Sequence, residues 1–98
     1  MELRQKRLSA PTTRRRGAYY VYLVRCRDGT YYAGATNDLQ QRLMAHNAGR
    51  GAKYVRGRRP VRLVYVSAHR DYQSALRAEH ALKTLTRKAK KALVAMSG

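Results

Sequence analysis

The chain has 98 residues, of which 44% are apolar, and it carries 22 Lys and Arg against five Asp and Glu, a net charge of +17. This length fits one small domain with a thin core, and the apolar content excludes a disordered chain. No apolar run approaches the roughly 20 residues that cross a bilayer, and the basic N-terminus lacks the apolar segment of a secretory signal. The charge favours polyanions, above all nucleic acid, because solubility alone needs far less of it.

Two features bound the organisation of the chain before any motif is considered. Residues 1–18 hold six basic residues and one acid with few apolar ones, so we interpret them as a flexible basic arm that adds nonspecific phosphate contacts. The folded domain is expected over residues 19–98. The single cysteine, Cys26, lies in an apolar run, which predicts a small buried side chain and a reducing compartment, the cytoplasm.

Periodicity and turn residues predict the order ββαβαα within that domain. In chain order we expect a strand over 19–27, a two-residue turn at Asp28-Gly29, a strand over 30–35, a helix capped by Thr36 or Asn37 and ended by Gly49, a basic loop over 50–60, a strand over 61–66, a helix over 72–85 and a last helix capped by Thr86. The helix over 72–85 should bury the apolar side chains of Ala75, Leu76, Leu82 and Leu85. The fold class is therefore α+β, a small three-stranded antiparallel sheet flanked by helices.

Tyrosines gather on the predicted hairpin. Side chains alternate along a strand, and residues of neighbouring strands on one face become neighbours, so Tyr22 and Tyr32 are expected to present two phenols together. Tyrosine is also a good strand former, and each ring has the simpler interpretation of half-buried core.

Arg42 and His46 lie four residues apart on the first predicted helix, hence on one face. Arginine offers a planar fork that matches phosphate, and histidine exchanges protons near neutral pH. The same spacing also occurs on ordinary solvated helix faces.

Glu79 is the one acid expected in mid-helix beside the core. Asp28, Asp38 and Asp71 fit a turn and two helix starts, whereas Glu79 lies three residues after Leu76. A carboxylate near the core needs a cation, which the spacing leaves open as Arg or Lys, or as Mg²⁺ with its waters and a substrate phosphate. No cluster fits zinc, and no Ser–His–Asp set or glycine-rich nucleotide loop is present.

Together these pieces resemble the GIY-YIG endonuclease family. Tyr20–Tyr22 stands where the family has Gly-Ile-Tyr, and Tyr32–Gly34 stands for Tyr-Ile-Gly. Arg42 follows eight residues later at the position of the family's catalytic arginine, His46 matches a histidine of many members, and Glu79 matches the metal-binding glutamate. Order and spacing agree over about residues 19–95, as in the small single-domain bacterial branch. The departures are a tyrosine for the first glycine, an alanine for the larger aliphatic residue, and no asparagine where some members carry one.

The resemblance implies metal-dependent hydrolysis of phosphodiester bonds in nucleic acid, most simply DNA, in repair or recombination. Glu79 would hold one Mg²⁺ or Mn²⁺, and Tyr22 would accept a proton from the attacking water, its pKa lowered by the surrounding positive charge. Arg42 would neutralise charge on the phosphate, and His46 and Tyr32 would orient water and phosphate. Gly34 would let the backbone approach closely. The basic loop supplies candidate substrate contacts: Lys53, Tyr54, Arg56, Arg58 and Arg59.

Two further hypotheses fit the charge equally well. One is a nucleic-acid-binding module, for DNA or structured RNA, that keeps the fold without cleavage, and the other is a ribosome-associated basic protein. The site residues favour the nuclease, because a carboxylate opposes the binding of a polyanion unless it serves a metal. An acidic membrane is a weaker partner, since no long amphipathic helix with a wide apolar face is predicted. The oligomeric state is left open.

Overall fold

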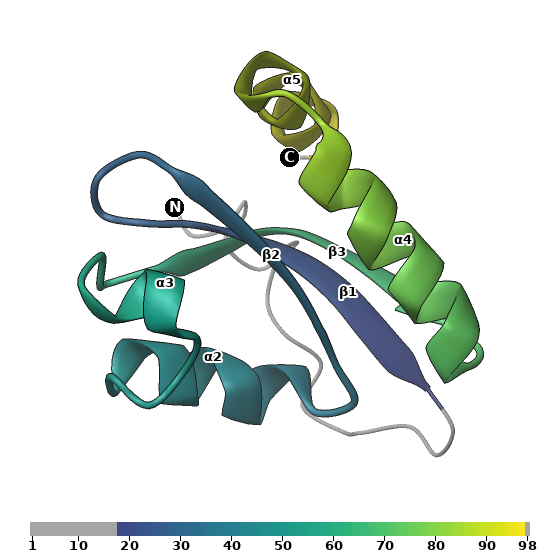
Figure 1. The fold of residues 1–98 in the computed structure, drawn as a ribbon, viewed down its shortest axis with the longest axis horizontal. Coiled ribbons are helices and arrows are strands. Elements are labelled where there is room, and N and C mark those ends of the chain that lie inside the picture. The colour runs from purple at the N-terminus through teal and green to yellow at the C-terminus, as the bar shows by residue number, and fades with distance from the viewer. Residues whose placement is uncertain (1–17, 98) are drawn as a thin grey trace.

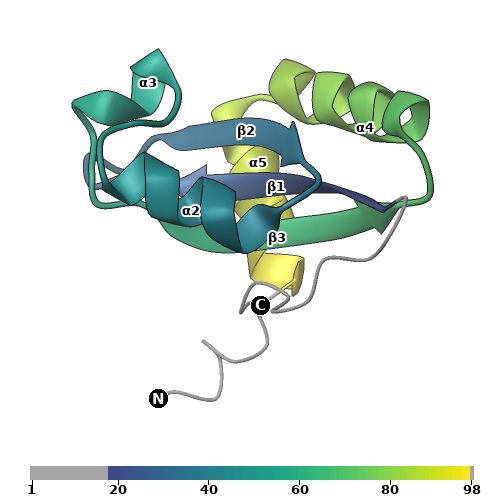
Figure 2. The ribbon, with the colours of Figure 1, turned by 90° about the horizontal axis from the view of Figure 1, so that it is seen from below.

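The computed structural model describes residues 18–97, so the expected basic arm lies outside the described residues apart from Ala18. The described chain forms a three-stranded antiparallel sheet in the order β2-β1-β3, with helices on both faces (Figures 1 and 2). The elements are β1 (Tyr19–Arg25), β2 (Tyr31–Thr36), α2 (Leu39–Asn47), α3 (Lys53–Arg56), β3 (Arg62–His69), α4 (Tyr72–Thr84) and α5 (Arg87–Ser97). The predicted fold class is confirmed. None of the helices in this part of the chain is long and apolar enough to span a membrane.

The central strand β1 is buried on both faces, which explains why its sequence is almost continuously apolar. On one face, Tyr20, Tyr22 and Val24 pack beneath α2 and α3. On the other face, Val21 and Leu23 pack against residues of α4 and α5. The domain therefore has two thin core layers that share one strand, and Cys26 is buried in the first of them, as expected.

The turn between β1 and β2 has three residues, and the expected two-residue turn is wrong. The Gly29 amide donates to the Cys26 carbonyl at 2.9 Å, and the Cys26 amide donates to the Thr30 carbonyl at 2.8 Å. Only Gly29 has a positive φ, 86°, which is the single left-handed residue that a three-residue hairpin loop requires. Asp28 instead uses its carboxylate to accept hydrogen bonds from the amide and hydroxyl of Thr30.

The helix ends differ from expectation by one residue at two places, the start of α2 and the end of α4, which lies at Thr84 instead of Leu85. Asp38, rather than Thr36 or Asn37, caps α2 by accepting from the Gln41 amide at 3.2 Å. The Thr36 hydroxyl accepts from the Asp38 amide, so it prepares the cap instead of forming it. Gly49, with φ of 86°, ends the α2 segment as predicted.

The helix α3 interrupts the stretch that was expected to be a loop. It has four residues and no side-chain cap, so its sequence carries no N-terminal signal. Its one fully buried residue, Val55, packs beneath the first face of the sheet.

The helix α4 buries fewer apolar side chains than expected. Ala75 and Leu82 of α4 are buried, but Leu76 and Leu85 are 41% and 36% exposed, so the predicted stripe was too wide. The helix α4 rests on β1 and β2, and α5 rests on β3. The Thr86 hydroxyl accepts from the Ala89 amide and caps α5, as predicted.

Candidate active site

Tyr22 is the centre of the site. It lies fully buried on β1, directly opposite Gly34 of β2. A Cβ atom on Gly34 would overlap with the hydroxyl and ring of Tyr22. The glycine is therefore needed because the phenol lies across β2, which gives the predicted close approach of the backbone a specific partner.

His46 of α2 meets the Tyr22 phenol from above the sheet. Its Nε2 lies 2.9 Å from the Tyr22 oxygen, and the whole residue is buried. Burial, and then the positive charge of Arg42, hold the pKa of His46 below its ordinary value. The imidazole is therefore neutral at neutral pH and is able to accept the phenol proton.

The second nitrogen of His46 finds no hydrogen-bond partner among residues 18–97. Nδ1 is buried and forms no hydrogen bond within the described part of the chain. Gly51 lies against it: a Cβ there would overlap with Nδ1 and would stand 2.8 Å from the His46 Cα. Gly51 is thus a residue of the site that sequence reasoning missed, because only the tertiary contact reveals why a side chain is excluded.

Tyr32 joins Tyr22 and His46 to the basic loop. Its ring centroid lies 6.5 Å from that of Tyr22 and 5.6 Å from that of His46. Its other neighbour is Tyr54, stacked at 6.0 Å with an interplanar angle of 21°. The Arg58 guanidinium lies 4.0 Å from the Tyr54 centroid. The predicted pairing of two phenols is confirmed, and a third ring extends it.

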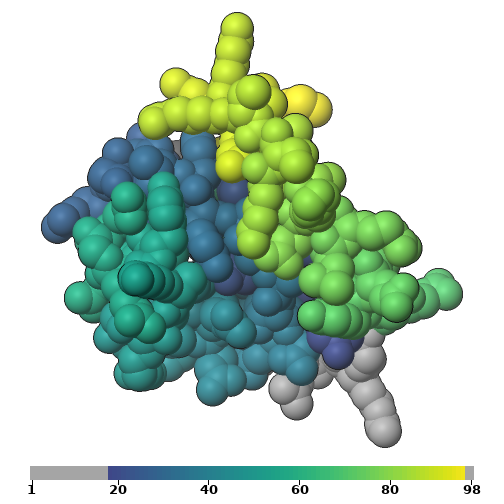
Figure 3. All heavy atoms as spheres, in the orientation of Figure 1, coloured from purple at the N-terminus to yellow at the C-terminus, as the bar shows by residue number. Residues whose placement is uncertain are grey.

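Arg42 and Glu79 approach the phenol from opposite layers. Arg42 is exposed on α2, and Glu79 projects from α4, whose helix covers the other face of the sheet. The charge of Arg42 lowers the pKa of Tyr22 and the charge of Glu79 raises it, so both side chains lie within electrostatic reach of the phenol. Atoms of β2 reach the surface between α3 and α4 in Figure 3, which is where the two layers meet.

The pKa of Tyr22 is raised, not lowered as expected. Burial is the largest cause, and the neighbouring Tyr32 adds to it; the charge of Arg42 opposes them, Glu79 raises the pKa further, and a hydrogen bond with Arg42 lowers it. One guanidinium does not offset the loss of hydration of a phenolate in the core. Tyr22 is therefore a neutral phenol at neutral pH in the metal-free protein.

Glu79 has a lysine as its cation. Its Oε2 lies 2.9 Å from Nζ of Lys83, one turn along α4, and the two side chains are 18% and 51% exposed. Of the alternatives left open by the sequence, the ion pair is the one present in the metal-free chain. The hydrogen bond to Glu79 raises the pKa of Lys83, so this lysine is charged.

The donor set limits which metal could bind. Among the described residues no group of three or more His, Cys, Asp or Glu side chains gathers at one place. One carboxylate with an exposed, movable lysine fits an ion that keeps several waters and takes one or two protein oxygens plus substrate phosphate, as Mg²⁺ does. It does not fit a closed site for zinc.

The predicted substrate contacts of the basic loop have structural partners. Arg58 donates to the Tyr54 carbonyl at 2.7 Å and pairs with Asp28 at 3.1 Å. Arg56 donates to the Gly51 carbonyl, and Arg59 donates to that of Arg56. These arginines hold the loop that places Gly51 and Tyr54. Their contact with substrate, and that of Lys53 on the exposed face of α3, stays a prediction.

Comparison with known proteins identifies the family. Residues 18–92 match the GIY-YIG catalytic domain. The chain belongs to the GIY-YIG family. It is 53% identical over 72 residues to a UPF0213 protein of Bacillus pumilus, which covers 74% of each chain.

Solved structures of similar proteins agree with the fold. The solution NMR structure of a UPF0213 protein from Bacillus halodurans is 43% identical, covers 83% of this chain and 86% of its own, and superposes with a TM-score of 0.55. A second NMR structure, of a protein from E. faecalis, is 34% identical, covers 86% and 91%, and has a TM-score of 0.57. Membership of the GIY-YIG family indicates a nuclease-type function with nucleic acid as substrate, and nucleases of this family generally depend on a divalent metal.

Proposed function

We propose that this protein is an endonuclease that hydrolyses phosphodiester bonds in DNA with the help of one divalent metal ion. The observation that carries the proposal is the convergence of five side chains around the Tyr22 phenol, from strands β1 and β2 and from helices α2 and α4 on opposite faces of the sheet: Tyr22, Tyr32, Arg42, His46 and Glu79. A fold that only binds nucleic acid needs the arginine but has no use for a carboxylate and a buried Tyr–His pair beside it.

Tyr22 and His46 act as a proton-transfer pair. Because the phenol is neutral, it takes the proton of the attacking water only if its own proton leaves, and the neutral Nε2 of His46 lies 2.9 Å away to accept it. His46 is thus the base behind Tyr22, a stronger role than the orienting one that the resemblance implied. The 2.9 Å between the Tyr22 oxygen and Nε2 of His46 is within the hydrogen-bond reach that general-base catalysis requires.

Arg42 and Tyr32 handle the phosphate. Arg42 is exposed on α2 and acts on Tyr22, so its guanidinium is placed to meet charge that grows on the phosphate beside the phenol. Tyr32 is half-buried over Tyr22 and His46 and is placed to donate its hydroxyl to a phosphate oxygen. Since Tyr22 itself is fully buried, a neighbouring side chain has to move before water reaches the phenol.

Glu79 is the residue that would hold the ion. When bound there, Mg²⁺ or Mn²⁺ supplies Lewis-acid stabilisation of charge on the phosphate and the leaving oxygen. Before that, Lys83 holds the carboxylate in an ion pair, and ion pairs between exposed side chains break at little cost. Binding of an ion to Glu79 would require Lys83 to leave the carboxylate.

One observation favours the alternative, a nucleic-acid-binding module without cleavage. The Glu79 carboxylate has a cation beside it in Lys83, so it does not need a metal ion as its counter-charge. Such a module would bind DNA without needing a carboxylate at residue 79.

A panel of labelled DNA structures distinguishes the two functions. Duplex, branched, single-stranded and nicked substrates are incubated with wild type and Glu79→Gln, with and without Mg²⁺ or Mn²⁺. We expect cleavage only by the wild type and only with metal, while the variant binds DNA equally well or more tightly because a negative charge is gone. Equal cleavage by both proteins identifies a contaminant and leaves the binding module as the function.

A further inference from the structure

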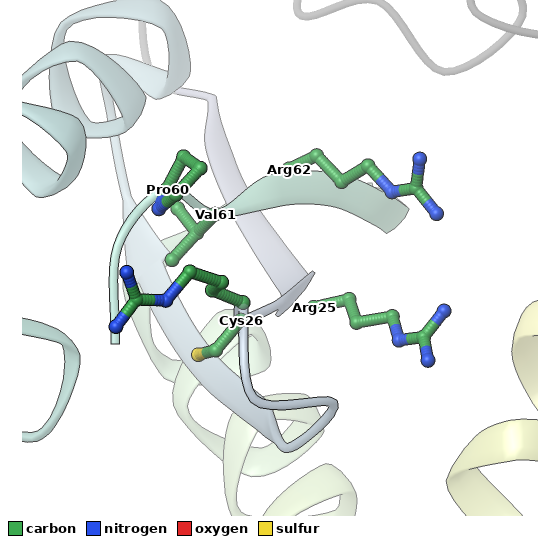
Figure 4. A pocket seen from close by; sticks show the side chains of 6 residues that line it. Arg25, Cys26, Pro60, Val61 and Arg62 are labelled. Atoms are coloured by element: carbon green, nitrogen blue, oxygen red, sulfur yellow. The ribbon is translucent and has the colours of Figure 1, made fainter.

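Two arginines lie directly opposite one another in the sheet. Arg25 ends β1 and Arg62 begins β3, and the antiparallel register pairs them. Both are exposed, and Figure 4 shows their side chains extending in the same direction beside a hollow floored by Cys26, Pro60 and Val61. Like charges at directly opposite positions destabilise a sheet, so this pair costs stability in the isolated chain.

A third arginine reaches the same place from another element. Arg87, at the start of α5, donates through Nη2 to the Gly29 carbonyl at 3.1 Å. A Cβ atom on Gly29 would have guanidinium nitrogens of Arg87 and Arg25 at 3.5 and 3.8 Å. The guanidinium groups of Arg25 and Arg87 therefore lie together beside the hairpin turn, and Arg62 is the partner of Arg25 across the sheet. We name Arg25, Arg62 and Arg87 the arginine triad.

No acid within residues 18–97 forms an ion pair with the triad. The four acids of that part of the chain are Asp28, Asp38, Asp71 and Glu79. Asp28 is the one in the hairpin turn, and it pairs with Arg58 instead. Asp38 and Asp71 cap helices, and Glu79 pairs with Lys83. A cluster of this kind, left without a counter-charge by the fold, is complementary to an external polyanion.

The triad also lies at a useful distance from the candidate active site. The backbone of Arg25 is three residues beyond that of Tyr22 on β1, about 10 Å at about 3.3 Å per residue, and strand alternation puts the two side chains on opposite faces of the sheet. Along a duplex, about 10 Å corresponds to roughly three base pairs. None of the triad belongs to the set of residues around Tyr22.

We propose that the arginine triad is a second anion-binding surface, which holds the phosphate backbone of a nucleic acid a few nucleotides away from the candidate active site. The proposal rests on the proposed function only for the identity of the polyanion. Arginine suits this role because its planar fork binds phosphate oxygens in pairs. The surface positions the strand without reading its sequence.

The test measures binding in EDTA, where metal-dependent cleavage does not occur. Affinity for a labelled DNA duplex is followed over a range of salt concentrations for wild type, for Arg25→Gln/Arg62→Gln, and for a control pair, Arg70→Gln/Arg77→Gln. The control removes the same charge from exposed arginines outside the triad. Each lost phosphate contact lowers the slope of log affinity against log salt by about 1, so the triad variant should lose about 2 and bind roughly tenfold or more weakly at moderate salt.

Two further readouts make the outcome clear. The melting temperature of Arg25→Gln/Arg62→Gln should equal or exceed that of wild type, because the repulsion between opposite strands is removed. Arg87→Gln, which lies outside the sheet, should lose about 1 in slope on its own. Equal losses in the triad and control pairs would overturn the proposal, since general charge would then explain binding. If the triad variant loses slope as expected but the wild type cleaves no DNA when metal is added, the proposed nuclease function is wrong and the proposed binding surface stands.

Discussion

Gly51→Ala is the substitution whose effect the structure defines best. The new Cβ would stand 2.8 Å from the His46 Cα and 2.9 Å from Cε1, well below the 3.4 Å at which ordinary contact begins, and closer still to Nδ1. The Cα belongs to the backbone of α2 and has no rotamer to escape to. The imidazole or the loop must shift, and the 2.9 Å contact between Nε2 and the Tyr22 oxygen is lost.

The size of the effect follows from two costs. Overpacking of this kind costs about 1–3 kcal/mol of stability, which lowers the melting temperature of a domain of this size by roughly 4–8 °C per kcal/mol. A catalytic group displaced by about 1 Å loses roughly 10²-fold in rate. DNA affinity should stay unchanged, because neither Gly51 nor His46 carries a charge at neutral pH.

The assay compares Gly51→Ala with Gly57→Ala by thermal unfolding and by single-turnover cleavage of the best substrate in the panel. Gly57 is the matched control: its φ is −93°, and a Cβ there meets nothing within 4 Å. The cost of Gly51→Ala should also shrink in a His46→Ala background, since the imidazole that it strikes is then absent. If Gly51→Ala melts and cleaves like Gly57→Ala, the packing of the Tyr22–His46 pair described above is wrong.

Two further predictions concern protonation and the Glu79 ion pair. Because the pKa of His46 is lowered, the rate of cleavage should fall on the acid side only below a pH of about 6.5, the ordinary pKa of histidine. The free energy of unfolding should likewise decrease as the pH falls from about 6.5 through the pKa of His46 in the folded protein. A decrease in rate that begins above pH 7, or one that persists in His46→Gln, would contradict the role given to His46. Lys83→Met should lower the Mg²⁺ concentration for half-maximal cleavage by up to about fivefold, because an ion pair worth roughly 0.2–1 kcal/mol no longer competes for Glu79. An unchanged or higher Mg²⁺ requirement would show that Lys83 does not compete with the metal.

The parts of the site that the sequence predicts are those set by local spacing. Strand alternation places Tyr22 and Tyr32 on one face, and a helical turn places Arg42 and His46 together, so these groupings follow without a structure. The cation beside Glu79 could not be predicted in this way. Spacing shows that a carboxylate lies near the core, but it does not show which cation accompanies it.

The features that escaped prediction depend on tertiary contacts or on small energy differences. Gly51 is needed only because α2 brings His46 against it, and no local pattern records that contact. The four residues of α3 have no capping side chain, so nothing in them distinguishes a helix turn from a loop. The pKa of Tyr22 was expected to fall with so much positive charge nearby, but burial dominates, and the depth of the phenol is known only from the packed structure.

The most direct test of the account is to locate a metal. Crystals of the protein with a DNA that resists cleavage are soaked in Mn²⁺, and the anomalous scattering of manganese is measured. The account predicts a peak bound to the Glu79 carboxylate and a phosphate oxygen, with Lys83 turned away from the carboxylate. A Glu79–Lys83 ion pair still closed at about its present 2.9 Å, with no manganese beside it, would contradict the central claim.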